Sequence, residues 1–223
     1  MRIEAVLFDL DGTLIDSSRC ILKCFKRSFE ELGLNYPGDN VISELIGRSL
    51  DDILQILNIP IDKREQFKKI CRSVTLNCKD LRLFPGMRDV LDFLKSKGIK
   101  IGVVTSKSMR GTKHSFEVVG LSFEDFDVVV TASDTKKHKP HPEPIFLALD
   151  RLKISPGDNV VFVGDSFNDV EAAWNAGVLP IYVDWGFGDI SKIYDSLDIH
   201  EKRNLVIVLT PEELKEFFDI VIY

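Results

Sequence analysis

A nearly continuous apolar run close to the N-terminus ends in two carboxylates, at residues 3–11 (Ile-Glu-Ala-Val-Leu-Phe-Asp-Leu-Asp). This run, closed by Gly12, predicts a strand buried on both faces, as in a parallel sheet, whose carboxyl edge is where such sheets bind ligands. If the strand continues through Asp9 and Asp11, the two anions point the same way and repel each other. A metal ion, a Lys or Arg, or a shared proton must then lie between them.

Two plainer interpretations of Asp9-Leu-Asp11-Gly12 compete with a functional site. A calcium loop of the EF-hand type counted from Asp9 needs glycine at position 14, and Leu14 stands there, so this interpretation fails. A polar turn after a core strand stays open on these residues alone, and the rest of the chain has to decide.

Length and charge bound the class of protein. The chain has 223 residues, of which 44% are hydrophobic, enough for one core plus a small second domain. A net charge of -6 argues against nucleic acid and anionic membranes as partners, because both need a basic face. No stretch approaches the ~18 consecutive apolar residues of a membrane span, and the first residues lack the apolar region of a signal peptide. We therefore expect a cytoplasmic location.

The chain divides by pattern into a helical insert and an alternating helix and strand region. Apolar residues at helical spacing and capping pairs such as Ser49 with Asp52 predict helices over about residues 16–82. From Met87 onward, helices alternate with predicted strands at 101–104, 128–130, 160–163 and 180–183. This rhythm predicts an α/β fold, a doubly wound parallel sheet of the Rossmann-like type. The expected domains are a core of residues 1–15 and 83–223 and an α-helical domain of residues 16–82 inserted after the first strand.

The four cysteines, Cys20, Cys24, Cys71 and Cys78, all lie on predicted helices of the insert. Their spacings of four and seven residues suit small buried side chains, so core packing is the expected role. Zinc is disfavoured because no Cys-x-x-Cys pair is present. A disulfide between the two helices stays open, as in an oxidising compartment or a hyperthermophile.

Three predicted strands are each followed by oxygen-bearing side chains, either carboxylates or hydroxyls. Asp9 and Asp11 follow the first strand, Thr105 and Ser106 follow another, and Asp165 with Asp169 follow a third. All three strand ends would meet at one edge of the sheet, with Lys139 added from a proline-rich loop. Carboxylates in this number suit Mg²⁺ better than zinc. Together with a lysine and the amides of a helix start, they predict a site for a phosphoryl group.

With these motifs the sequence resembles the haloacid dehalogenase superfamily of phosphohydrolases, and within it the phosphoglycolate phosphatase-like branch. The first motif is Asp9-Leu-Asp-Gly-Thr13, the second is Thr105, the third is Lys139 with Pro140, and the fourth is Gly164-Asp-Ser-x-x-Asp169. The resemblance covers nearly the whole chain and implies that the helical insert is a mobile cap. It also implies an Mg²⁺-dependent phosphatase acting on a small phosphorylated metabolite, with phosphoglycolate first in line.

The resemblance assigns roles to individual residues. Asp9 would attack phosphorus to give an aspartyl phosphate, and Asp11 would protonate the leaving oxygen and then activate water. Thr105 would donate to a phosphoryl oxygen, and Lys139 would neutralise both Asp9 and the phosphate. The expected metal-binding group is Asp9, Asp11 through its backbone carbonyl, Asp165 and Asp169. Of these, Asp169 is expected to orient the other ligands rather than to bind the ion directly.

Substrate contacts are expected from Thr105, Ser106, Lys107 and Arg48. A guanidinium suits a substrate carboxylate or a second anionic group, so Arg48 is the candidate for that contact. Plainer roles stay open for three of these residues: a helix N-cap for Thr105, and solvated helix ends for Lys107 and Arg48.

Four other functions stay open. A sugar-phosphate mutase of the β-phosphoglucomutase type and a pyrophosphatase share this architecture. A receiver-like signalling module also groups acids, Thr and Lys, but it predicts about 120 residues without an insert. A catalytically silent regulatory homologue is the fourth. The oligomeric state, monomer or homodimer, does not follow from the sequence.

Overall fold

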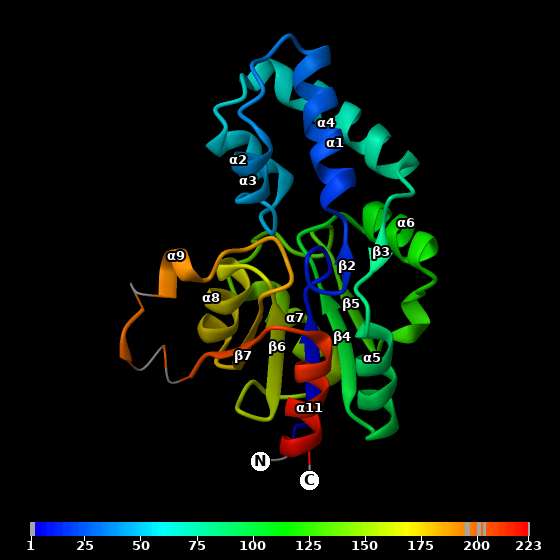
Figure 1. Ribbon diagram of the computed structural model, residues 1–223, viewed down its shortest axis with the longest axis vertical. Coiled ribbons are helices and arrows are strands. Elements are labelled where there is room, and N and C mark those ends of the chain that lie inside the picture. Colours follow the sequence, from blue (N-terminus) through cyan, green and yellow to red (C-terminus); the bar gives the residue numbers. More distant parts are fainter. Residues whose placement is uncertain (1–2, 195–196, 200–201, 203, 223) are drawn as a thin grey trace.

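In the computed structural model, which describes residues 3–194, 197–199, 202 and 204–222, a parallel sheet forms the centre of the molecule (Figure 1). Within these residues the sheet has six strands in the order β5-β4-β1-β6-β7-β8, all parallel. They are β1 (Ala5–Phe8), β4 (Lys100–Val104), β5 (Val128–Val130), β6 (Val160–Gly164), β7 (Leu179–Val183) and β8 (Val206–Val208). The predicted doubly wound parallel sheet is thus confirmed, and β8 is an addition that the sequence patterns had not indicated.

The first strand is shorter than the apolar run predicted. Strand β1 ends at Phe8, although the Asp9 amide still donates to the Val163 carbonyl at 2.9 Å. The chain then turns at Gly12, whose φ of +93° is a backbone conformation that favours glycine. Asp9 and Asp11 therefore lie in the turn beyond the strand. The strand does not continue through them, so the strand geometry that was expected to point both side chains the same way is absent.

Helices cover both faces of the sheet because its strands are apolar on both faces. One face packs against α5 (Met87–Ser96), α6 (Met109–Val119) and α11 (Pro211–Val221). The other packs against α7 (Glu143–Leu152) and α8 (Phe167–Ala176). A 3-10 turn, Phe123–Asp125, and a short helix, α9 (Ser191–Tyr194), lie in connections. Strands β4 and β5 follow β1 on one side of the sheet, and β6, β7 and β8 lie on its other side. The strand order therefore reverses at β1, and parallel sheets bind ligands at the carboxyl end of such a switch point.

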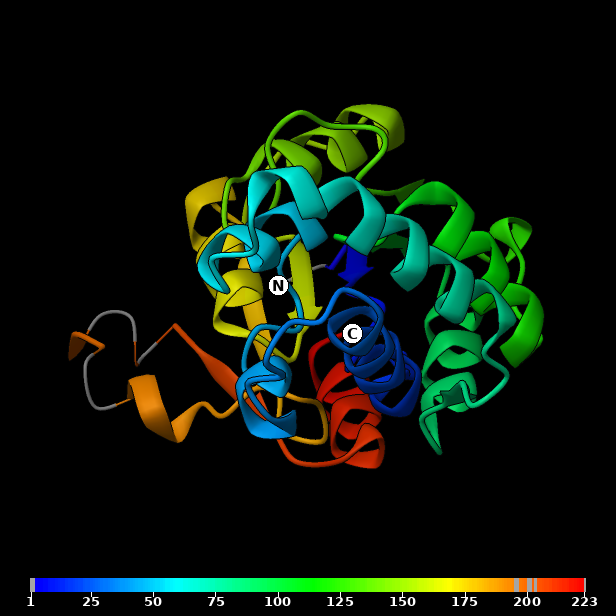
Figure 2. The same ribbon diagram turned by 90° about the horizontal axis from the view of Figure 1, so that it is seen from above.

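The helical insert lies over the carboxyl ends of the strands (Figures 1 and 2). It consists of α1 (Ser18–Glu31), α2 (Asp39–Ser43), α3 (Leu50–Ile56) and α4 (Ile61–Asn77). An antiparallel pair, β2 (Ile15–Asp16) and β3 (Arg82–Leu83), joins it to the core. Its own apolar cluster is centred on Phe25, Phe29 and Phe67, separate from the clusters around the sheet. We call helices α1–α4 and their connections the cap; the predicted boundaries of 16–82 stay a prediction.

Disulfides tie the two long helices of the cap together. Cys20 is bonded to Cys78 and Cys24 to Cys71, with Cα atoms 5.8 and 4.6 Å apart. One bond links α1 to α4 and the other links α1 to Cys78, the residue directly after α4. The expectation that the cysteines pack as free thiols is therefore corrected in favour of the disulfide that had been left open. The cysteines are also buried, because bonded sulfurs still fill apolar space.

None of the helices in the described part of the chain is long and apolar enough to cross a membrane. The cytoplasmic location expected from the sequence stays a prediction.

Candidate active site

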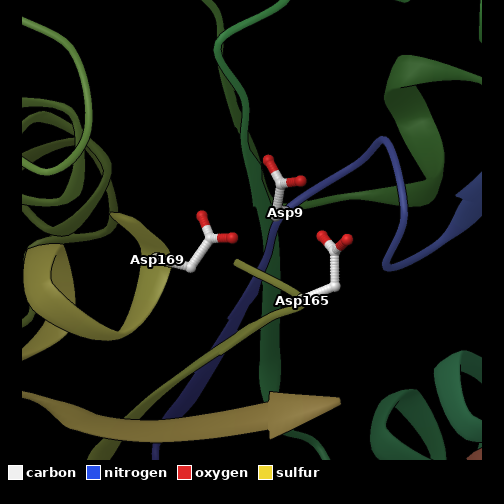
Figure 3. Close-up of side chains that lie close together, drawn as sticks. All are labelled: Asp9, Asp165 and Asp169. Atoms are coloured by element: carbon white, nitrogen blue, oxygen red, sulfur yellow. The ribbon is translucent and has the colours of Figure 1, made fainter. Parts of the chain in front are cut away.

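Three carboxylates converge at the carboxyl edge of the sheet (Figure 3). Asp9 follows β1, Asp165 follows β6, and Asp169 lies in the first turn of α8. One oxygen from each lies within 4.8 Å of the others, and all three residues are buried. Parallel strands bring their carboxyl ends to one edge, so Asp9 lies beside Asp165 although 156 residues separate them in the sequence. The structure thus brings together three of the four predicted metal-site residues.

Lys139 supplies a buried positive charge beside these acids. Its ammonium donates to Asp9 Oδ1 at 2.5 Å, to Asp169 Oδ1 at 2.6 Å and to the Val104 carbonyl at 3.2 Å, and its side chain is 1% exposed. Burial alone would lower the pKa of Lys139, but the charges of Asp169 and Asp9 raise it above its ordinary value. The lysine is therefore charged at neutral pH and compensates for part of the negative charge of the group.

Among the described residues, no cation other than Lys139 pairs with these three acids, so part of their negative charge remains. The pKa of the Asp9 carboxyl is raised from 3.8 to about 7, because burial and the neighbouring charge of Asp169 raise it by more than the pull of Lys139 lowers it. Burial, with Asp169 and Asp9, also raises the pKa of Asp165 well above its usual range. Asp9 Oδ2 is buried and, among the described residues, has no hydrogen-bond partner. A buried carboxylate oxygen in this state can bind a cation.

Asp165 is held in place from several sides. The Thr13 hydroxyl donates to its Oδ1 at 3.2 Å, and the Phe187 amide donates to its Oδ2 at 2.7 Å. A Cβ added to Gly186 would lie 2.2 Å from Asp165 Cβ, so only glycine allows this approach. The segment 184–188, directly after β7, is a part of the site that sequence reasoning missed. Its Gly-x-Gly at the end of an apolar strand was the available signal.

Asp169 uses both of its oxygens within the protein. While Oδ1 binds Lys139, Oδ2 accepts from the Ser166 amide at 3.0 Å and the Ser166 hydroxyl at 2.6 Å. The Ser166 hydroxyl in turn caps α8 by accepting from the Asp169 amide. This capping box fixes the Asp169 carboxylate, whose other oxygen orients Lys139.

Asp11 lies apart from the carboxylate cluster and has an ammonium of its own. Lys107 donates to both of its oxygens, at 2.7 and 2.8 Å, and both side chains are mostly buried. The two N-terminal carboxylates thus have separate cations rather than one between them. Lys107, predicted as a substrate contact, binds Asp11 in this structure.

Thr105 and Ser106 lie at the end of β4, where the sequence placed them. The Thr105 hydroxyl accepts from the Lys107 amide at 3.1 Å, whereas Ser108 provides the N-cap of α6, so the alternative of an N-cap at Thr105 is wrong. The Ser106 hydroxyl donates to the Gly47 carbonyl of the cap at 3.0 Å. This contact joins cap and core directly above the site.

A cavity of about 360 Å³ lies between cap and core. Asp9, Asp11, Thr105 and Lys107 line its core side, and Arg48 lines it from the cap. Arg48 and Asp9 therefore share one cavity. The Arg48 Nε is buried and has no hydrogen-bond partner in the part of the chain that the structure describes. A substrate group in the cavity could supply the acceptor.

The sequence matches a family model over residues 6–183, and that family is described as haloacid dehalogenase-like hydrolase. The chain belongs to the haloacid dehalogenase-like hydrolases. It is therefore an enzyme, and the family resemblance found in the sequence is confirmed.

Relatives of this hydrolase carry names of two activities. A Clostridium perfringens protein provisionally named pyrophosphatase PpaX is 37% identical over an alignment of 215 residues, with 95% of this chain and 99% of that protein covered. A phosphoglycolate phosphatase of Nitrosococcus oceani is 28% identical, with 86% and 89% of the two chains covered. A solved haloacid dehalogenase-like hydrolase of Streptococcus pneumoniae superimposes on this hydrolase with a TM-score of 0.82 at 25% identity, covering 97% and 98% of the two chains.

Proposed function

We propose that this hydrolase is an Mg²⁺-dependent phosphatase that transfers the phosphoryl group of a small phosphorylated metabolite to Asp9 and then to water. The observation that carries the proposal is the state of Asp9. One of its oxygens is bound to Lys139, and the other is buried, without a partner among the described residues, beside Asp165 and at the edge of the cavity. Membership of a hydrolase family and the names of the relatives support the same activity.

The donor set fits Mg²⁺. Asp9 and Asp165 offer hard carboxylate oxygens, no described histidine or cysteine joins the group, and the raised pKa values of both acids indicate a shortage of positive charge. Asp9 and Asp165 would hold the ion, with the Asp11 carbonyl as the third protein ligand inferred from the family resemblance. When bound, Mg²⁺ lowers the repulsion between an attacking carboxylate and a phosphate dianion.

The side chains of the site divide the reaction between them. An Asp9 oxygen forms a bond to phosphorus while the bond from phosphorus to the leaving oxygen breaks, and Asp11 gives that oxygen a proton. Asp11 then takes a proton from the water that cleaves the aspartyl phosphate. Before either step Asp11 has to exchange its contact with Lys107, because both of its oxygens accept from that ammonium in this structure.

Groups on the cavity wall would bind the substrate. The Thr105 hydroxyl, and Ser106 when its contact with Gly47 opens, would donate to phosphoryl oxygens, and Lys139 would neutralise their charge. Lys107, once released from Asp11, and Arg48 would bind a second anionic group. Phosphoglycolate, which has a carboxylate beside its phosphate, is the first candidate. Pyrophosphate is the second, favoured by the names of the PpaX relatives.

An assay of phosphate release tests this proposal. The purified protein should release phosphate from at least one compound in a panel of phosphoglycolate, hexose monophosphates and pyrophosphate, with Mg²⁺ present. Addition of EDTA should stop the release, and an excess of Mg²⁺ should restore it. Conversion of a hexose 1-phosphate to its 6-phosphate without release would instead identify a mutase. No reaction with any compound would contradict the proposal.

Gly186→Ala should weaken Mg²⁺ binding about tenfold or more, a factor that corresponds to about 1.4 kcal/mol. The new methyl group would lie 2.2 Å from Asp165 Cβ, so it must displace the carboxylate. Binding is measured by calorimetric titration of the protein with Mg²⁺, without substrate. Gly157→Ala is the matched control, because its Cβ would meet only the end of the Asn159 side chain. Equal Mg²⁺ affinity in the two variants would show that segment 184–188 does not position Asp165.

A further inference from the structure

Apolar side chains form part of the cap side of the active-site cavity, beside the charged side chains of Arg48, Asp51, Lys68 and Arg72. Helices α1, α3 and α4 each contribute aliphatic or aromatic side chains to the cavity lining. The segment directly before α3 contributes one more. These side chains are Ile21, Phe25, Ile46, Leu50, Ile53 and Leu76. We call this set the apolar wall.

The apolar wall faces polar groups across the cavity. The core side there consists mainly of Asp9, Asp11, Thr105, Ser106, Lys107 and Ser108. Apolar side chains gain stability when they bury surface against one another, and the core offers little such surface here. Phe25, Ile46 and Ile53 are themselves buried in the cap, so packing leaves unexplained only the exposed parts of Ile21, Leu50 and Leu76.

Leu76 is the wall residue that most clearly does not belong to the apolar interior of the cap. It is half-buried and lines the cavity, and it belongs to none of the apolar clusters found among the described residues. Ile21 and Leu50 pack on the edge of the cap cluster and are also only partly buried. An apolar body entering the cavity would bury the exposed parts of these three side chains.

We infer that the leaving group of the natural substrate is organic and places an apolar face against this wall, which ranks phosphate esters with a hydrocarbon body above both phosphoglycolate and pyrophosphate as substrates. The inference rests on the proposed phosphatase function and narrows its substrate class. Pyrophosphate has no apolar surface, and the single methylene of phosphoglycolate offers little. Cleavage of the substrate would give inorganic phosphate and an alcohol with a hydrocarbon body.

Matched phosphate esters of 2-hydroxy acids test this inference. Phosphoglycolate, the phosphate ester of 3-phenyllactate and that of 2-hydroxy-4-methylpentanoate share the phosphate and the neighbouring carboxylate and differ only in their apolar side chain. At least one apolar ester should have a kcat/KM about tenfold or more above that of phosphoglycolate, because it buries a hydrocarbon group on the wall. Pyrophosphate should be a poorer substrate than both apolar esters. The two apolar esters are chiral, and each is assayed as separate enantiomers.

A pair of substitutions in α4 shows whether the wall causes the preference. Leu76→Gln should lower the ratio of kcat/KM between the better apolar ester and phosphoglycolate by about fivefold, since a polar side chain then meets the hydrocarbon. Ile61→Gln is the matched control, because Ile61 is 83% exposed and does not line the cavity. This control should leave the ratio unchanged.

The outcomes separate the two proposals. A preference for pyrophosphate or phosphoglycolate over both apolar esters overturns the inference and leaves the phosphatase function intact. An unchanged ratio in Leu76→Gln also overturns it, because the wall then does not select the substrate. Absence of phosphate release from all four compounds, together with failure of the wider panel, overturns the phosphatase function and the inference with it.

Discussion

Replacing Asp9 by asparagine is expected to lower kcat by at least about 10⁴-fold, because the amide cannot attack phosphorus. The amide has nearly the shape of the carboxyl group and keeps an oxygen for Lys139, so the folded structure should persist. Phosphate release under saturating substrate and Mg²⁺ measures the effect, and circular dichroism checks the fold.

Asp92→Asn is the matched control for this substitution. Asp92 is exposed on α5, so the same chemical change there should leave kcat within about twofold of the parent enzyme. Full activity of Asp9→Asn would remove Asp9 as the nucleophile and would leave it as a metal ligand at most. Loss of fold in Asp9→Asn would move the test to mass spectrometry of the parent enzyme, in which a trapped aspartyl phosphate should map to the peptide with Asp9.

Replacing Lys139 by methionine is expected to destabilise the metal-free protein by roughly 3–5 kcal/mol near pH 8, because it leaves buried carboxylates without their cation. The ammonium it removes is 1% exposed and contacts both Asp9 and Asp169. The free energy of unfolding in urea, measured with EDTA present, gives the effect. Lys137→Met, at an exposed position in the same loop, should change stability by less than about 0.5 kcal/mol.

The destabilisation by Lys139→Met should be smaller at pH 5.5 than at pH 8. In the parent protein the pKa of Asp9 is about 7, above its ordinary 3.8, so the folded state holds a proton that the unfolded state releases. The stabilisation that accompanies a raised carboxyl pKa is present at low pH and is lost as the pH rises from about 4 to about 7. Without Lys139, which lowers the pKa of Asp9, that pKa rises further and the loss extends above pH 7. An equal effect at both pH values would show that the Asp9 carboxyl does not titrate in this range.

Much of the fold was predictable because its signals are local in the sequence. Strand β1, the alternation of helix and strand after Met87 and the helical insert all follow from apolar periodicity over short windows. The meeting of Asp9 with Asp165 was also predictable, because parallel strands carry their carboxyl ends to a common edge. Local patterns were less informative about where elements end. The apolar run suggested a strand that reached Asp11, but β1 ends at Phe8, and the chain turns at Gly12.

The pairing of side chains between distant segments needed the tertiary structure. Cys20 and Cys24 could each face either of two cysteines on α4, and only the relative rotation of α1 and α4 decides the partners. The spacing of residues likewise does not indicate that Lys107 binds Asp11, 96 residues away, or that the Phe187 amide holds Asp165.

The residue types at the ends of the buried strands, which are acids, hydroxyls and a nearby lysine, were enough to predict a site for a metal ion and a phosphoryl group. The coordinates were needed to show which ammonium pairs with which carboxylate and that an apolar wall lines the cavity. This division arises because strand ends are fixed by backbone hydrogen bonds within a sheet, whose pattern is repetitive. The cavity, by contrast, is formed by side chains of the cap and the core, and their contacts depend on how those two packed units fit together.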